Sequence, residues 1–103
     1  MELYGLKTCD SCRKAIKALT GATYIDVRAD GVPPAVLKEA AARFGDKLVN
    51  KSSATWRTLG PEDRARDALD LVSENPTLMK RPLIVQGDTM TLGWKADAQE
   101  VWT

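Results

Sequence analysis

Histidine is missing from this 103-residue sequence, and its lack rules out several kinds of chemistry. Without an imidazole, no Ser-His or Cys-His pair can activate a nucleophile. Two cysteines are too few to supply the four ligands of a structural zinc site within one chain. Only a metal shared between two chains stays open, and we expect no bound metal or cofactor.

The sequence also has no dominant charge and no long hydrophobic run. Fifteen basic and 14 acidic residues give a formal charge of +1, which predicts no direct nucleic-acid or membrane partner. No stretch approaches the ~20 apolar residues of a membrane span. The first residues also lack the basic and apolar regions of a signal peptide. We therefore expect a cytoplasmic protein, in a compartment where disulfides are usually transient.

The first third of the chain has the pattern of a strand, a helix and a second strand. Residues 2–6 and 23–27 have strand composition, whereas apolar residues recur at helical spacing from 12 to 19. A strand–helix–strand unit this short predicts two parallel strands joined by a right-handed crossover.

The middle of the chain is predicted to be helical. One helix begins at Pro33 or Pro34 and ends at Gly45. A second begins at Pro61, with acidic residues in its first turn and an inward stripe running from Ala65 to residue 72. A further helix start is predicted at residues 75–76, where Asn precedes Pro.

The last third is predicted to form an antiparallel hairpin followed by a helix. Residues 81–85 and 89–94 have strand patterns and flank a tight-turn signal. The alternation predicts that Met90, Leu92 and Trp94 share one face. A final helix is predicted to dock on the sheet, with Trp94, Ala98, Val101 and Trp102 at helical spacing.

These elements predict an α/β protein with the minimal thioredoxin-like fold. The order is βαβ, a helical insert at about residues 33–79, and then ββα, with one small mixed four-stranded sheet. At this length we expect a single domain, residues 1–103.

Both cysteines lie at the start of the first predicted helix, as Cys9 and Cys12 in "CDSC". Such a pair can be a redox device, half of a metal site or two small core residues. The unpaired N–H groups at a helix start stabilise an anion, so we expect a lowered pKa for Cys9. Lys7 and Arg13 are expected to add to this effect. Cys12 lies on the apolar face, either as a resolving thiol or as a small core residue.

Four stretches, in order, resemble the arsenate reductase-related (ArsC) family, which includes the YffB proteins and the Spx regulators. They are "LYGLKTCDSCRKA", "LVNKSSATWRTL", "NPTLMKRPLIV" and "LGW". The chain is most similar to the short YffB-like members. The resemblance implies a thioredoxin-like fold with a helical insert.

The resemblance also implies roles for particular residues. Cys9 matches the nucleophile, and Pro82 matches a cis-proline. Arg57, expected in a connection ahead of a helix, and Arg81 match two arginines that hold an oxyanion and stabilise the thiolate. Taken without the resemblance, each arginine would be interpreted as a surface charge. The remaining residues expected to bind substrate surround these positions: Lys7, Thr8, Asp10, Ser11 and Arg13.

We therefore expect a monomeric thiol-disulfide oxidoreductase with an oxyanion or thiol substrate. Glutathione or glutaredoxin is the expected partner, with glutathione as co-substrate. The C-x-x-C pair supports an alternative, a redox-switched transcriptional regulator that binds RNA polymerase as Spx does. A third hypothesis is true arsenate reductase. The reductases carry a third arginine near "LGW", but no arginine follows Arg81 here, which argues against this hypothesis.

Overall fold

The computed structural model describes all residues from 1 to 103, and they form two compact units. The first unit contains both ends of the chain, Met1–Asp30 and Arg81–Thr103, and the second is Gly31–Lys80. The predicted helical insert, about residues 33–79, falls within the second unit.

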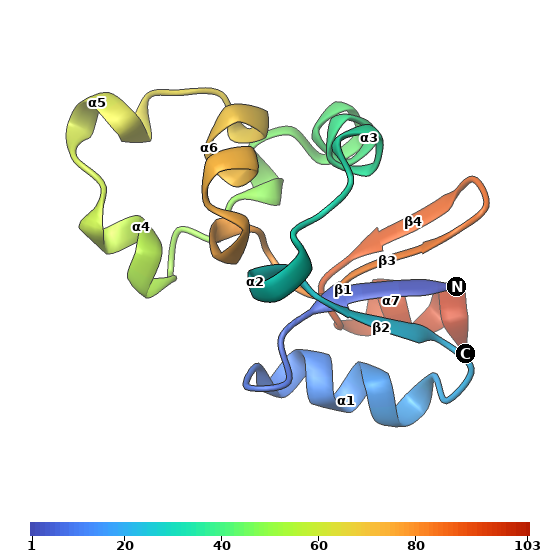
Figure 1. Cartoon of the computed structure of the whole chain (residues 1–103). Helices are drawn as coiled ribbons and strands as arrows, with labels where there is room; N and C mark the ends of the chain where they lie inside the picture. The colour runs from blue at the N-terminus through green and yellow to red at the C-terminus, as the bar shows by residue number, and fades with distance from the viewer. The chain divides into compact units, whose positions relative to one another are not determined.

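The first unit is built on a mixed four-stranded sheet with the order β2-β1-β3-β4 (Figure 1). The parallel pair is β1 (Glu2–Gly5) and β2 (Thr23–Asp26), joined through a helix. β3 (Leu83–Gln86) runs antiparallel to β1 and forms a hairpin with β4 (Thr89–Leu92). The predicted α/β thioredoxin-like fold and its mixed sheet are therefore confirmed, although both hairpin strands are shorter than expected.

Two helices, α1 (Asp10–Ala18) and α7 (Ala96–Trp102), lie on one side of this sheet (Figure 1). Between sheet and helices, Leu3, Ala15 and Ile84 form a fully buried cluster. α7 buries Ala98 against the sheet, but Val101 is 50% exposed, so its predicted docking role is wrong.

The predicted common face holds for Met90 and Leu92 but is wrong for Trp94. Thr91 pairs with Ile84 in the sheet and accepts a hydrogen bond of 2.6 Å from Trp102 Nε1, so Thr91 lies on the side of the helices. Met90 and Leu92 alternate to the other side. The strand ends at Leu92, and after this end Trp94 packs against the same buried cluster as Trp102.

A short helix that the sequence did not predict, α2 (Val27–Asp30), directly follows β2. Asp26 Oδ1 accepts hydrogen bonds from the backbone N–H groups of Arg28, at 2.8 Å, and Ala29, at 3.1 Å. This capping ends the strand one residue earlier than predicted, because an Asp side chain can satisfy the first N–H groups of a helix.

The second unit consists of short helices. They are α3 (Pro34–Phe44), η1 (Gly45–Leu48), α4 (Ala54–Thr58), α5 (Pro61–Arg64), α6 (Ala68–Glu74) and η2 (Pro76–Leu78). α3 spans the predicted residues, and its buried Leu37 and Ala40 lie on the face that contacts α6.

The single helix predicted from Pro61 is wrong, since the chain forms α5 and α6 separately. Asp67 is extended, with φ −59° and ψ 144°, and occupies the N-cap position of α6. The buried stripe begins only at Ala68, whereas Ala65 is exposed. Without an inward side chain at 65, no burial holds residues 65–67 in a continuous helix, and an aspartate is favourable as an N-cap.

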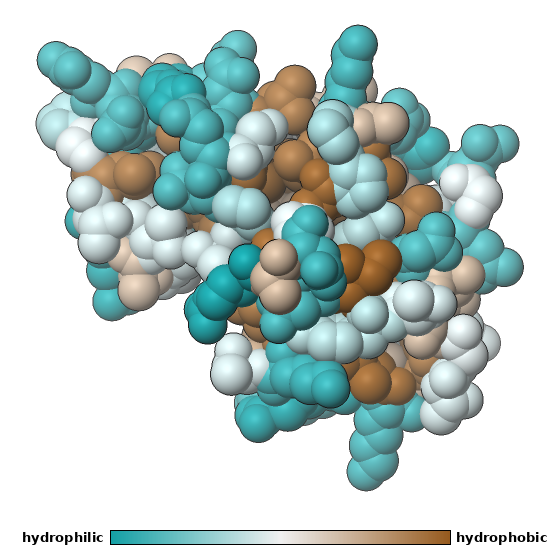
Figure 2. Space-filling model, viewed as in Figure 1, coloured by the Kyte–Doolittle hydropathy of each residue, from teal (hydrophilic) through white to brown (hydrophobic).

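The surface view in Figure 2 shows hydrophilic side chains over most of the visible face, with smaller apolar areas between them. No helix has both the length and the apolar character needed to cross a membrane.

Candidate active site

Cys9 is the N-cap residue of α1. Its backbone is extended, with φ −90° and ψ 126°, and its carbonyl accepts the first helical hydrogen bond, from Arg13 N at 3.0 Å. The N–H of Cys9 donates to the Leu6 carbonyl at 3.0 Å, which closes the turn between β1 and α1. The half-buried sulfur therefore sits where the first N–H groups of the helix are exposed.

The environment of Cys9 favours its thiolate. Partial burial opposes ionisation, but the backbone N–H and the thiol of Cys12 and the guanidinium of Arg81 outweigh it. Together they hold the pKa of Cys9 below its ordinary value. The predicted direction of the shift is confirmed, and Arg81 is the cation that acts on the sulfur.

Cys12 has the opposite environment. Its side chain is 0% exposed, and its Sγ accepts a hydrogen bond of 3.4 Å from the backbone N–H of Leu6. Burial, assisted by the negative charge of Cys9, raises the pKa of Cys12 to about 12. The site therefore combines a thiol at the helix start that ionises more readily than a free cysteine with a thiol behind it that stays neutral at neutral pH.

Arg81 and Pro82 lie directly before β3. The peptide bond between them is cis, as the resemblance implied. The carbonyl of Pro82 accepts a hydrogen bond of 2.9 Å from Gly93 N, next to the end of β4. The sheet thus fixes the backbone that carries the Arg81 guanidinium toward Cys9.

The other charges expected to act on Cys9 are engaged elsewhere. Lys7 Nζ lies 5.2 Å from the centre of the Tyr24 ring, and Arg13 forms an exposed ion pair of 2.6 Å with Asp10. The groups that lower the pKa of Cys9 are Cys12 and Arg81, so the structure does not support the predicted contribution of Lys7 and Arg13. The sequence did not predict that Tyr24 lies near this turn. In the structure its OH accepts a hydrogen bond of 3.0 Å from Lys7 N.

Of the remaining predicted substrate contacts, Thr8 lies in the turn before α1 and Ser11 in the first turn of the helix. Their roles stay predictions. Arg57 belongs to the second unit, in the last turn of α4 rather than in a connection. Ser53 caps this helix, because its side-chain oxygen accepts a hydrogen bond of 3.1 Å from Trp56 N. The role of Arg57 toward an oxyanion stays a prediction.

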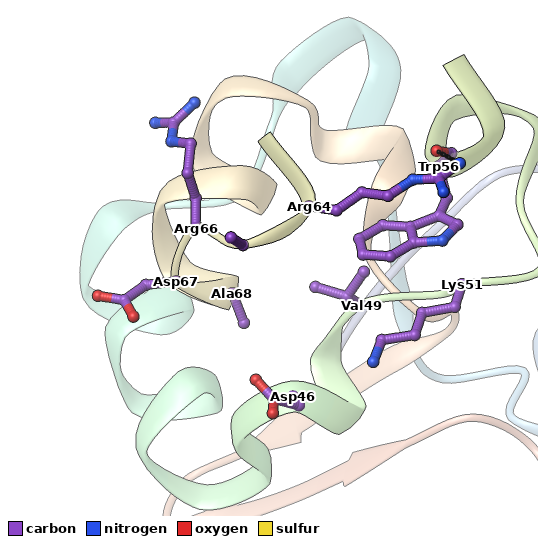
Figure 3. Close-up of a pocket in the computed structure, with 9 residues that line it drawn as sticks. Asp46, Val49, Lys51, Trp56, Arg64, Arg66, Asp67 and Ala68 are labelled. Carbon is purple, nitrogen blue, oxygen red and sulfur yellow. Dashed lines mark hydrogen bonds between the residues drawn. The ribbon is translucent and has the colours of Figure 1, made fainter. Parts of the chain in front are cut away.

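The second unit also contains a polar hollow of about 200 Å³ (Figure 3). Trp56 lines it, with Lys51 Nζ at 5.7 Å and the Arg64 guanidinium at 5.3 Å from the ring centre. Asp46 and Asp67 contribute negative charge to the same lining. Trp56 is half-buried, so its ring is partly open to this hollow. No group of three or more acidic or cysteine side chains is placed to hold a metal ion.

A thioredoxin-like fold with a cysteine at the start of its first helix, and with an arginine and a cis-proline directly before β3, defines a class of thiol-dependent proteins. Within this class, the chain belongs to the ArsC family, whose model matches residues 4–101.

Known proteins resemble the chain over most of their length. An uncharacterized protein of Haemophilus influenzae is 39% identical in an alignment of 103 positions that covers 89% of this chain and 89% of the relative. A solved YFFB protein is 28% identical, with a TM-score of 0.86 over 98% of this chain and 96% of the other. An ArsC-related protein from Brucella melitensis is 25% identical, with a TM-score of 0.71 over 98% and 92%.

Proposed function

We propose that this protein is a thiol-disulfide oxidoreductase in which Cys9 is the nucleophile and glutathione or glutaredoxin is the electron donor. The family supports a thiol-dependent reductase. The observation that carries the proposal is the pair of opposed thiols, with the pKa of Cys9 lowered and that of Cys12 raised. Such a difference in pKa distinguishes an attacking thiolate from a resolving thiol.

In the first step, the Cys9 thiolate attacks one sulfur of a disulfide, for example a protein-glutathione mixed disulfide. A bond forms between Cys9 and the glutathione sulfur while the original S–S bond breaks. The departing thiolate takes a proton from solvent, so the substrate is reduced and Cys9 becomes glutathionylated.

The second step releases glutathione from Cys9 by one of two routes. Cys12 can attack the Cys9 sulfur after losing its proton, which forms a Cys9–Cys12 disulfide. Alternatively, an external glutathione thiolate attacks the mixed disulfide, which regenerates the Cys9 thiolate and yields glutathione disulfide. Burial is the main cause of the raised pKa of Cys12 and persists after Cys9 has reacted, so we expect the external route to be faster at neutral pH.

We propose that Arg57 and Arg81 bind the anionic part of the substrate. A guanidinium offers several donors in a planar fork, which suits a carboxylate or another oxyanion. Arg81 is supported by its contact with Cys9, and Arg57 by the resemblance alone.

The decisive experiment combines mass spectrometry with turnover. The reduced protein and its Cys9→Ser and Cys12→Ser variants are treated with glutathione disulfide, and the mass of each is measured. Glutathione should attach at Cys9, and Cys12→Ser should retain the adduct. Reduction of a glutathione mixed disulfide is then followed as NADPH oxidation, coupled through glutathione reductase. An adduct absent from Cys9, or turnover no higher than in Cys9→Ser, would refute the function.

The C-x-x-C pair supports a second candidate, a redox-switched regulator that binds RNA polymerase. Capture of polymerase by the oxidised but not the reduced protein, without reductase turnover, would favour it. Arsenate reduction is the third candidate, and no arginine follows Arg81 to supply the third oxyanion ligand. Arsenate-dependent NADPH oxidation in an assay coupled through glutathione and glutaredoxin would restore it.

A further inference from the structure

Gly5 is the last residue of β1, and its backbone does not require a glycine. It pairs with Asp26 in the parallel register, and it is not among the glycines with positive φ. Any residue can therefore adopt its backbone conformation. A glycine weakens a strand, since it has no side chain to pack and loses more conformational entropy. The reason for glycine at this position must therefore lie in its surroundings.

Those surroundings are the sulfur of Cys12. A Cβ atom added at Gly5 would lie 2.6 Å from Cys12 Sγ and 3.3 Å from Cys12 Cβ. The first distance is far shorter than a van der Waals contact, so the sulfur would have to move. Cys12 is fully buried, and its Sγ accepts the hydrogen bond from Leu6 N at 3.4 Å, so a displacement would break a specific contact.

We propose that Gly5 is a positioning residue for the thiol pair, because its missing side chain leaves the space in which the Cys12 sulfur is held next to Cys9. This inference rests on the proposed function for Cys9 as the nucleophile.

The consequence for Cys9 follows from the contacts already described. The thiol and the backbone N–H of Cys12 both favour the Cys9 thiolate. A displaced sulfur can no longer donate its hydrogen bond to Cys9. The space at Gly5 is thus expected to control how much of Cys9 is ionised, although Gly5 does not touch the substrate.

The test is a double-mutant cycle with Gly5→Ala, Cys12→Ala and both together. The rate at which iodoacetamide modifies Cys9 is measured against pH by peptide mass spectrometry. Gly21→Ala is the matched control, because a Cβ at Gly21 would meet nothing within 4 Å. Loss of one hydrogen bond, about 1 kcal/mol, lowers the thiolate population about fivefold. Since a more basic thiolate is also more nucleophilic, Gly5→Ala should slow modification below the pKa by about twofold to threefold.

In the Cys12→Ala background, Gly5→Ala should change the rate little, because the displaced sulfur is gone. An unchanged profile in Gly5→Ala, or equal slowing with and without Cys12, would overturn the proposal. If Gly5→Ala is too unstable for the alkylation assay, the midpoints of thermal unfolding decide. The double variant should then unfold at a higher temperature than Gly5→Ala. Equal instability of the two would also overturn it. None of these readouts needs reductase turnover, so failure of the proposed function is distinguished from failure of this inference.

Discussion

Replacing Arg81 by Gln should make Cys9 a more basic thiol. The guanidinium both hydrogen-bonds the sulfur and attracts its negative charge. A glutamine removes the charge and keeps much of the length and polarity of the side chain. Since the positive charge favours the thiolate, its loss must raise the pKa of Cys9.

The size of the effect follows from the geometry. Hydrogen bonds to charged groups contribute about 1.5–3 kcal/mol, and the half-buried Cys9 should lie near the lower limit, or about tenfold in thiolate population. The more basic thiolate reacts faster, which offsets part of this loss. Modification by iodoacetamide should therefore be about threefold slower at pH values below the wild-type pKa. Above both pKa values, the variant should instead be faster than the wild type.

Arg43→Gln provides the control, because it removes the same charge from a surface ion pair with Glu39 in the second unit. Its profile should match the wild type. The reasoning about Arg81 would be refuted if Arg81→Gln left the midpoint of the rate profile unchanged. It would also be refuted if the control shifted the midpoint by as much.

Three further predictions concern stability. Trp102→Phe should lower the free energy of unfolding by about 1 kcal/mol in urea, because it removes the hydrogen bond to Thr91; no loss would contradict that contact. The raised pKa of Cys12 means that the unfolded chain loses this proton at lower pH than the folded protein. Stability should therefore fall as the pH rises from about 8.5 toward 12, and Cys12→Ala should reduce this slope; an unchanged slope would refute it. Gly87→Ala should cost about 1–2 kcal/mol in urea, because Gly87 has φ +58° in the hairpin turn; a cost equal to that of Gly21→Ala would contradict this.

The sequence predicted the sheet because its signals are local. Strand composition at 23–27 and helical spacing from 12 to 19 each occupy one short window, and only one handedness joins them. The same holds for α3, which begins after Pro33 and ends before Gly45. A hydrophobic period and a terminating residue are enough to predict such elements.

The predictions were wrong where tertiary contacts decide where a strand or helix ends. Nothing in the alternation of residues 89–94 shows that β4 ends at Leu92, so the side to which Trp94 turns could not be predicted. The break between α5 and α6 depends on whether Ala65 finds a buried partner. Whether one alanine is buried depends on how the whole unit packs, so it cannot be predicted from the local sequence.

The site shows the same division. The position of Cys9 at a helix start, and hence the direction of its pKa shift, follows from the chain order alone. Which cation acts on it was implied by the family resemblance and not by the chain order, because Arg81 is distant along the chain and only the pairing of β1 with β3 brings it near. Sequence proximity instead favoured Lys7 and Arg13, whose partners Tyr24 and Asp10 are visible only in the structure.

The most direct test of the thiol chemistry is a titration of Cys9 in the reduced wild-type protein. The ultraviolet absorbance of the thiolate is followed against pH, and the signal of Cys9→Ser is subtracted. Cys9 should titrate below about 8.5, the ordinary value for a cysteine. A midpoint at or above that value would mean that neither the helix start nor Arg81 stabilises the anion, and the proposed nucleophile would be lost.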